Sequence, residues 1–500
     1  MKDKVNNYLA TTVSNSHWYL RFTEIFVPLT AWIMITMPIW LSFWHPALVA
    51  YFIIAFDLYF LYKSIQTAYY ATISYKVILE TEDVPFNKKI EKWEKAKPLA
   101  HFVIIPNYKE PLYKLEDTIG DIVKSDYPFK EIYLVLAFEK REEEAKDKYE
   151  ALKEKFGHFF KDVIVSYHVL VSNEVPGKAS NQTFASRIVS DYVRAHGLSP
   201  EETVVTICDA DSRLPINYFS YLTYEFIKDV NRKYHFYWAP VFLYNNFWQL
   251  PFFVRMQATL SSILRLAFLS QKERLIQLST YSTNLWLLEA VNYWDVDIIP
   301  EDWHIFFQAF FAFGDKVRTI PLYTTTNGDA VYSGNMFKTL VNRYEQEKRW
   351  AWGVTDISYA LSRLFTTPHI PMKLKLKRIF LLTETHLLWP TSFFILTLSA
   401  SVPPLVNPLF KRTVLGFILP QLSGLILTIA SLTLILYIYL DITLRKRLKI
   451  ETKLISMPLL FVQWYLLPVI SFLLSSLPAL DAHTRLLIGK KITYKVTEKV

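Results

Sequence analysis

The sequence predicts an α/β domain with a mostly parallel sheet, inserted between two groups of transmembrane helices. Three observations lead to this fold class. The chain of 500 residues is 52% apolar and 16% aromatic with a positive mean hydropathy, so it is more apolar than ordinary soluble proteins. Its longest apolar stretches lie near the two ends of the chain. In the polar middle, apolar runs of strand length alternate with charged helical patterns.

The apolar stretches are long enough to be membrane spans, since a span needs about 20 mostly apolar residues. They run over Glu24–Trp44, Ala47–Ile65, Ile379–Ala400, Val414–Leu440 and Leu459–Leu480. The first is predicted to be a retained anchor, because a second apolar stretch follows it and small residues typical of a signal-peptide cleavage site are not apparent. Glu384 and His386 weaken the third prediction, and Pro468 interrupts the fifth stretch.

The distribution of basic residues predicts the orientation. Basic clusters precede the third stretch and follow the fourth, which places both, and the polar region 75–370, on the cytoplasmic side. Five spans would put the basic tail outside, so the fifth stretch is predicted to be re-entrant or interfacial. The net charge of +9 suits anionic lipid headgroups better than nucleic acid, because the basic residues gather beside the apolar stretches. The single Cys208 forms no intrachain disulfide, consistent with a cytoplasmic domain.

The polar middle predicts a sheet whose strands are buried on both faces. The expected strands are Ala100–Pro106, Glu131–Phe138, Asp162–Val171, Thr203–Asp209, His235–Tyr244 and Val317–Tyr323. Ligands of such sheets bind beyond the carboxyl ends of the strands, so functional side chains are expected there. The helix predicted over Phe252–Ser270 is apolar on one side, with Arg255 and Arg265 opposite. It fits either a core-packing helix or a helix in the membrane interface.

Two carboxylate pairs have the spacing Asp-x-Asp. Asp209 and Asp211 follow a buried strand, whereas Asp295 and Asp297 do not. Carboxylate oxygens suit Mg²⁺ or Mn²⁺, which in turn binds diphosphate, so the first pair is the candidate metal site. The alternative for this pair is an acidic turn or a helix cap.

A third acidic pair begins a predicted helix. Glu301 and Asp302 follow Pro300, where carboxylates often cap a helix. The functional alternative is a general base that takes a proton from an attacking hydroxyl. His304 either binds substrate or is structural.

Three further side chains follow the first three strands. Gly177 and Lys178 form a turn ahead of a helix that suits a phosphate contact. Glu110 could reach a base or ribose. Glu139 follows the second strand, and its alternative is the solvated first charge of a helix.

Five pieces of sequence stand in one order: VIIPNYKE, PGKASNQ, CDADS, PEDWH and QEKRW. In this order they resemble the membrane-embedded family 2 glycosyltransferases, the group that includes cellulose and hyaluronan synthases. The match runs from Ala100 to Gly353, and the flanking spans and C-terminal tail suit it. The family's Q-x-x-R-W pattern falls on Gln346, Arg349 and Trp350.

The resemblance implies a Rossmann-like GT-A fold and transfer of a sugar, with inversion, from a nucleotide-diphosphate donor. Asp302 would be the catalytic base. Asp211, with Asp209 beside it, would hold Mg²⁺ or Mn²⁺ and the donor diphosphate.

The other site residues would contact the two substrates. Glu110, Lys178 and Glu139 would seat the nucleotide, although family members usually carry an aspartate where Glu139 stands, which leaves uridine open. The acceptor and diphosphate would be lined by Glu301, Gln346, Arg349 and Trp350. Arg349 suits a leaving diphosphate, and Trp350 offers a flat face to a sugar ring. The alternative, an aromatic belt at the membrane, suffices for Trp352.

The resulting hypothesis is a multi-pass plasma-membrane enzyme with a cytoplasmic catalytic domain and a polysaccharide or glycolipid acceptor. A non-processive lipid-linked sugar transferase and an inactive membrane scaffold are the alternatives, and a partner subunit completing a channel is left open. The predicted organisation is an N-terminal cytoplasmic segment 1–23, two transmembrane helices in 24–70, a transferase domain 71–370 with interfacial helices near 252–270 and 335–376, about three spans or re-entrant helices in 377–480, and a basic tail 481–500.

Overall fold

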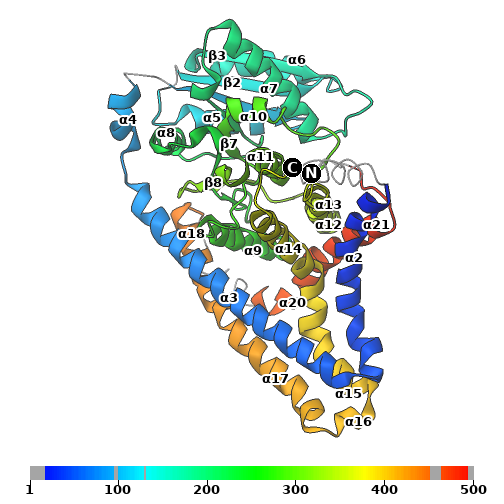
Figure 1. Ribbon diagram of the computed structural model, residues 1–500. Helices are drawn as coiled ribbons and strands as arrows, with labels where there is room; N and C mark the ends of the chain where they lie inside the picture. The colour runs from blue at the N-terminus through cyan, green and yellow to red at the C-terminus, as the bar shows by residue number, and fades with distance from the viewer. Residues whose placement is uncertain (1–16, 95–98, 129–130, 451–462, 494–500) are drawn as a thin grey trace. The chain divides into compact units, whose positions relative to one another are not determined.

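The computed structural model describes residues 17–94, 99–128, 131–450 and 463–493 (Figure 1). Two compact units make up the chain. The sheet unit comprises residues 73–245 and 268–329, and the helical unit comprises residues 1–72, 246–267 and 330–500. The N-terminal segment 1–16, part of the fifth apolar stretch and the last residues of the basic tail lie outside the described residues.

The sheet unit contains a seven-stranded mixed sheet in the order β3-β2-β1-β4-β7-β5-β8. The strands are β1 (Ala100–Asn107), β2 (Ile132–Glu139), β3 (Asp162–His168), β4 (Thr203–Ile207), β5 (His235–Trp238), β7 (Tyr281–Asn284) and β8 (Arg318–Pro321). A small second sheet pairs β6 (Val241–Phe242) with β9 (Thr326–Asn327). The strands from β3 to β4 are parallel, and β5 and β8 are parallel to each other. The mostly parallel α/β fold predicted from the sequence is confirmed.

One strand of the seven-stranded sheet was not predicted. β7 runs antiparallel to both of its neighbours, β4 and β5. Its sequence, YSTN, is short and polar, so it lacks the apolar run that revealed the other central strands. The predicted strand His235–Tyr244 is divided between the two sheets, with Ala239 and Pro240 between β5 and β6.

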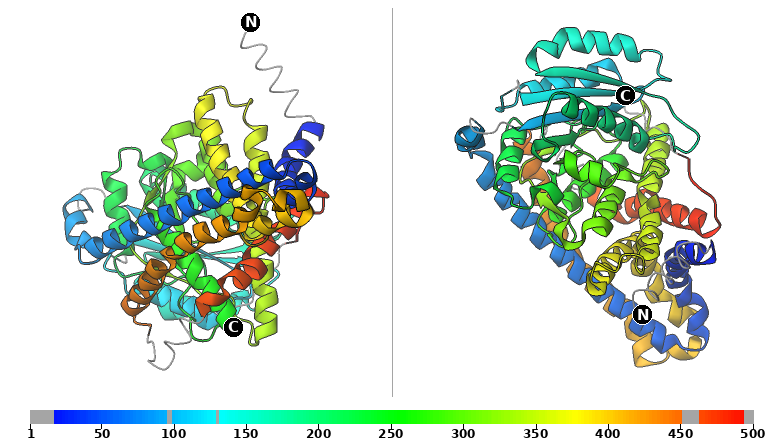
Figure 2. Two further views of the ribbon diagram at one scale, coloured as in Figure 1. Left: turned by 90° about the horizontal axis from the view of Figure 1, so that it is seen from below. Right: turned by 45° about the horizontal axis from the view of Figure 1, so that its top comes forward.

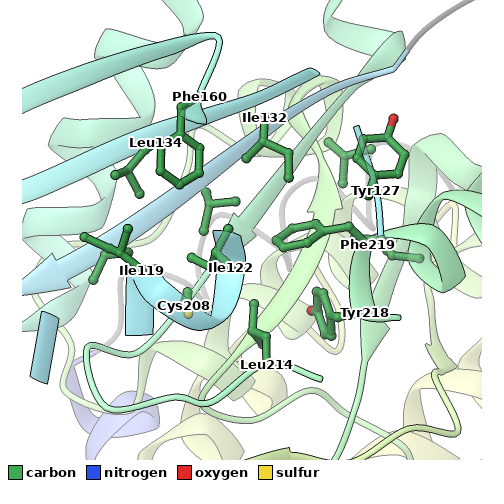
Figure 3. Close-up of a cluster of buried hydrophobic side chains, with 14 of the residues drawn as sticks. Ile119, Ile122, Tyr127, Ile132, Leu134, Phe160, Cys208, Leu214, Tyr218 and Phe219 are labelled. Atoms are coloured by element: carbon green, nitrogen blue, oxygen red, sulfur yellow. The ribbon is translucent and has the colours of Figure 1, made fainter. Parts of the chain in front are cut away.

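Helices cover the sheet on both faces (Figure 1), which is why strands such as β1, β2 and β4 are apolar along most of their length. The helices of this unit are α4 (Phe86–Glu94), α5 (Leu112–Val123), α6 (Ala145–Phe156), α7 (Lys178–Ala195), α8 (Tyr218–Lys228), α10 (Leu285–Ala290) and α11 (Glu301–Phe313). On one face, α5 and α8 contribute Ile119, Ile122 and Phe219 to a core with Leu134 of β2 (Figure 3). α7 packs against β1, β2 and β3.

The helical unit contains the predicted membrane segments. Its helices are α2 (His17–Trp40), most of α3 (Pro46–Glu82), all but the end of α9 (Phe252–Leu269), α12 (Met336–Ala351), α13 (Thr355–Ser362), α14 (Met372–Leu398), α15 (Val402–Val406), α16 (Pro408–Lys411), α17 (Val414–Ser431), α18 (Thr433–Arg447), α20 (Leu467–Ser471) and α21 (Leu477–Leu487). A single π-helical turn, Phe472–Ser476, joins α20 to α21. α3 runs beside α17 (Figure 2), and Asp57 of α3 accepts a hydrogen bond from Ser423 of α17 at 2.6 Å.

Six helical segments of the described residues are long and apolar enough to cross a membrane, so the chain is a membrane protein by this criterion. Five coincide with the predicted stretches, although the fifth is described only from Gln463. Large apolar side chains such as Phe22, Tyr62 and Phe417 are exposed on these helices, as lipid-facing side chains are. Glu384, which weakened the third prediction, pairs with Lys63 at 3.2 Å and accepts a hydrogen bond from Tyr59.

The sixth segment is α9. About two-thirds of it (67%) is buried, against 28% to 39% of the other five, as expected for the core-packing alternative. Arg255 and Arg265, which the sequence placed opposite the apolar side, are both buried as well.

Candidate active site

The candidate site lies where the chain reverses its direction across the sheet, between β1 and β4. Asp209 and Asp211 follow the carboxyl end of β4. Because β7 is antiparallel to β4, the residues that enter β7 reach the same edge of the sheet. There, the Asp209 amide donates to Thr280 Oγ1 at 3.1 Å, and Ser279 Oγ donates to the Asp209 carboxylate.

Lys178 begins α7 and links three carboxylates. Its Nζ lies 2.7 Å from Asp209 Oδ1, 3.5 Å from Asp302 Oδ1 and 3.6 Å from Glu301 Oε1. It also donates to the backbone oxygen of Ser279 at 2.9 Å. Burial lowers the pKa of Lys178, but Asp209, Asp302 and Glu301 together raise it well above its ordinary value, so the ammonium stays charged.

Asp302 is held from outside its own helix. Its Oδ2 accepts from the Ser279 amide at 2.7 Å, and Gln277 Nε2 donates to its backbone oxygen at 3.0 Å. The residue at the N-cap of α11 is Pro300, which makes no side-chain capping bond. Burial raises the pKa of Asp302, Lys178 opposes that rise, and Glu301 adds to it, with a net value of about 7. The Asp302 carboxyl group can therefore exchange a proton near neutral pH.

Ser279 connects the two acidic groups. Its hydroxyl contacts Asp209, its amide contacts Asp302 and its carbonyl accepts from Lys178. The backbone of Ser279 has φ of 65°, a left-handed conformation that a non-glycine residue adopts at a cost of about 1 kcal/mol or more. The sequence held no signal for Ser279, because the strand that it precedes was not recognised.

Asp211 lies among a different set of groups. Its Oδ2 accepts from the Asp329 amide at 3.0 Å, and Asp329 in turn pairs with the buried Lys114 at 3.1 Å. Gly328 lies close by: a Cβ atom there would be 3.0 Å from Val241 Cγ1 and 3.9 Å from Asp211 Oδ2. Neither Asp329 nor Lys114 was singled out from the sequence, since both acquire their role only when β9 and α5 meet this edge.

Among the described residues, no group of three or more His, Cys, Asp or Glu side chains is arranged to hold a metal ion. Asp209 is already paired with Lys178. The oxygen ligands of Asp209 and Asp211 suit Mg²⁺ or Mn²⁺, which proteins commonly bind through one or two carboxylates completed by substrate phosphates. The residues therefore fit a divalent ion that arrives with a diphosphate, not one in an all-protein cage.

Glu139 is buried, so the alternative interpretation of it as the solvated first charge of a helix is wrong. It ends β2 with 2% of its surface exposed, and its Oε1 lies 3.1 Å from His168 Nδ1. His168 Nε2 lies 2.9 Å from Glu174. Burial lowers the pKa of His168, but the two glutamates raise it above its ordinary value overall. Glu110 follows β1, and its backbone oxygen accepts from Lys148 at 2.9 Å.

The second Asp-x-Asp pair has a structural role through Asp295. Its Oδ2 lies 2.9 Å from Nε2 of His304, and its Oδ1 accepts from Gln308 at 3.0 Å. His304 is buried, with 3% of its surface exposed. The contact with Asp295 therefore supports a structural role for His304.

The Q-x-x-R-W residues lie on α12, in the helical unit. The Trp350 ring lies 4.7 Å from Arg343 Cζ and 5.6 Å from Arg265 Cζ. Arg343 also donates to the side-chain oxygen of Gln346 and pairs with Glu347, and both of these bonds are buried. The tryptophan face and the Gln346 side chain are thus oriented by arginines that the motif does not include, while Arg349 at the same turn is half-buried.

One sequence-family model matches the chain. The matching family is glycosyl transferase family group 2. The matched residues, 204–445, include Asp209, Asp211, Asp302 and the Q-x-x-R-W residues but neither Glu139 nor Lys178. The match confirms the resemblance to family 2 glycosyltransferases that the motifs predicted. No curated protein sequence matches the chain.

Several solved structures also resemble the chain over part of its length. A mannosyltransferase from Pyrobaculum calidifontis, PcManGT in complex with GDP-Man and Mn²⁺, is 14% identical with a TM-score of 0.41, over 78% of this chain and 99% of that chain. S. aureus TarS 1–349 with UDP-GlcNAc is 14% identical with a TM-score of 0.32, over 70% and 92%. GalNAc-T7 with UDP, GalNAc and Mn²⁺ is 15% identical with a TM-score of 0.32, over 56% and 54%. At these scores no correspondence of individual residues follows.

Proposed function

We propose that this protein is an inverting membrane glycosyltransferase that transfers a sugar from a nucleotide-diphosphate donor to a growing polysaccharide or glycolipid. The observation that carries the proposal is the contact between Asp302 and Lys178 at the edge of the sheet where ligands bind. It joins a carboxyl group with a pKa of about 7 to a cation that also contacts the Asp-x-Asp pair. The match of residues 204–445 to family group 2 supports the reaction class.

In this mechanism Asp302 is the general base. Its carboxylate takes the proton of an acceptor hydroxyl as that oxygen bonds to the anomeric carbon. The bond from this carbon to the diphosphate oxygen breaks, and the electron pair leaves with the nucleotide diphosphate. Attack from the face opposite the leaving group inverts the configuration. The hydrogen bond from the Ser279 amide fixes Oδ2, which leaves Oδ1, on the side of Lys178, as the basic oxygen.

The leaving diphosphate needs positive charge. Lys178 and Arg349 are the cations proposed to contact it, and Asp211, with Asp209 beside it, would hold a divalent ion. Such an ion, when bound, would supply charge that neutralises the diphosphate. Lys178 can turn from Asp209 towards the donor, since its long side chain has three rotatable donors.

The acceptor is proposed to contact Trp350, Gln346 and Glu301. The Trp350 ring can stack on the apolar face of a sugar, and Arg343 and Arg265 restrict its orientation.

Glu110 and Glu139 are proposed to contact the nucleotide. The catalytic unit is proposed to be cytoplasmic and the membrane to be the plasma membrane.

The test is donor turnover by the full-length protein in nanodiscs. Nucleotide-sugars would be presented one at a time with Mn²⁺, Mg²⁺ or EDTA, with membrane lipids and simple sugars as acceptors, and nucleotide release would be measured. Release from one donor that requires metal and is lost in Asp211→Asn and Asp302→Asn supports the transferase and identifies its sugar. Asp297→Asn, in the second Asp-x-Asp pair, is the matched control and should retain turnover. Release of nucleotide from none of the donors would favour the scaffold alternative.

A further inference from the structure

A second cationic cluster lies in the helical unit, around the aromatic ring of Phe247. Arg255, in the first turn of α9, lies with its Cζ 5.4 Å from the ring centroid. Arg445, near the end of α18, lies with its Cζ 4.9 Å from the same centroid. One ring therefore contacts two guanidinium groups. The adjacent Trp248 ring lies 5.0 Å from Arg255 Cζ and is 37% exposed.

The two arginines differ in their partners. Arg445 donates to Asp441 Oδ2 from Nε at 3.0 Å and from Nη2 at 2.8 Å. Arg255 donates from Nη2 to the backbone oxygen of Leu250 at 2.8 Å. Among the described residues, its Nε is buried without a hydrogen-bond partner, and no carboxylate pairs with its guanidinium. The buried cluster of two arginines and Asp441 thus has a net charge of +1.

This arrangement is suited to bind an anion. A guanidinium that leaves water without a counter-ion is costly, and aromatic contacts offset only part of that cost. Arg255 is 8% exposed, and Arg445 provides a second positive charge instead of a negative one. A guanidinium presents a planar fork of N–H donors that matches the oxygens of phosphate or carboxylate.

The neighbouring residues indicate which anion it is. Arg445 belongs to the final turn of the apolar segment Val414–Arg447, so it lies at the end of a candidate span. The exposed residues Lys446, Arg447 and Lys449 follow it. Basic clusters at the end of a span attract anionic lipids, and a half-exposed tryptophan is typical of the headgroup level. We propose that Arg255 and Arg445 form a binding site for the phosphate group of a membrane lipid.

The experiment measures lipid binding without any sugar donor, so its outcome is separate from that of the proposed transferase. The full-length protein, stripped of lipid in detergent, would be titrated with a radiolabelled polyprenyl phosphate. Phosphatidic acid, diacylglycerol and inorganic phosphate would be used as competitors. Phosphatidic acid should compete because it supplies a lipid phosphate, whereas diacylglycerol has the chains without the phosphate, and inorganic phosphate has no chain.

The informative variant is Arg255→Met, which keeps the length of the side chain and removes its charge. Because Arg255 has no carboxylate partner among the described residues, this change leaves no buried carboxylate unpaired, and the variant should melt no lower than wild type in lipid-free detergent. Its Kd for the polyprenyl phosphate should rise at least about tenfold. Arg447→Met, an exposed arginine two residues beyond Arg445, is the control and should change Kd less than about threefold.

Equal binding by Arg255→Met and wild type, or competition by diacylglycerol as strong as that by phosphatidic acid, would overturn the proposal. Competition by inorganic phosphate alone would assign the site to a free anion and would also overturn it. If Arg255→Met fails to fold, Arg255→Lys replaces it. Lysine keeps the charge but loses the planar fork, and should weaken binding by a smaller factor than methionine would.

Discussion

Replacing Lys178 by methionine removes the cation that faces Asp302, and this should move the pH dependence of the reaction. Asp302 must be a carboxylate to accept a proton, so kcat/KM rises with pH through its pKa, which is about 7 in the wild type. Lys178 lowers that pKa, whereas Glu301 and Asp209 raise it. Without Lys178 only the Ser279 amide still opposes the two carboxylates, and the rise in activity should occur at higher pH.

The size of the shift follows from the 3.5 Å between Lys178 Nζ and Asp302 Oδ1. At an effective dielectric constant of about 20, unit charges at that distance attract by about 5 kcal/mol, or about 3.5 pKa units. Two effects make the shift in the Asp302 pKa smaller than this. Lys178 lies closer to Asp209 than to Asp302, and metal and solvent compensate part of the charge that the variant loses. We therefore expect an upward shift of about 1 to 3 units.

The assay is kcat/KM for the donor at saturating metal, from about pH 5.5 to about pH 9.5. Lys178→Met should also lower the plateau, because the same side chain is proposed to contact the diphosphate, but the midpoint does not depend on the height of the plateau. Lys124→Met, at an exposed lysine of the same unit, should leave the midpoint unchanged. A midpoint in Lys178→Met that stays near 7 or falls would refute the assignment of Asp302 as the titrating base or of Lys178 as its counter-ion.

Three other outcomes are expected. Asp302→Asn should reduce kcat by about 10² to 10⁴ but keep donor binding, measured by titration calorimetry. Asp211→Asn should lose the metal-dependent part of donor binding. Equal loss of binding in both variants would contradict the assignment of Asp302 as the base and Asp211 as a metal ligand. Ser279→Ala keeps the amide that donates to Asp302 but loses the hydroxyl that donates to Asp209. The midpoint of the pH dependence of kcat/KM should therefore stay near 7, while KM for the donor rises a few-fold. A moved midpoint would show that the Ser279 hydroxyl affects the pKa of Asp302. The folded-state pKa of His168 is raised, so the stability that its charged form contributes is fully present below the ordinary pKa of histidine and is lost as pH rises through the raised pKa. His168→Gln should therefore remove this contribution to the decline in melting temperature between about pH 5.5 and about pH 8.5. An unchanged decline would argue against the Glu139–His168–Glu174 contact.

The sequence alone determined the parts of the fold that depend on local pattern. Apolar runs identified β1, β2, β3 and β4, because a strand buried on both faces must be apolar along its whole length. The position of Asp209 and Asp211 after such a strand placed them at the edge where ligands bind. The apolar stretches at the two ends predicted membrane segments for the same reason: lipid accepts only apolar surface.

The tertiary structure decided the contacts that link distant parts of the chain. The antiparallel β7 is polar and short, so no periodicity revealed it, and with it Ser279 stayed hidden. A carboxylate in a sequence shows neither its burial nor its neighbours. The elevated pKa of Asp302 comes first from its burial, with Glu301 adding to the rise and Lys178 opposing it, so it emerges only once the chain has folded and α7 and α11 have met. In the same way, Arg255 looked like the polar side of a helix until packing buried it, because burial of a charge depends on what other segments cover it.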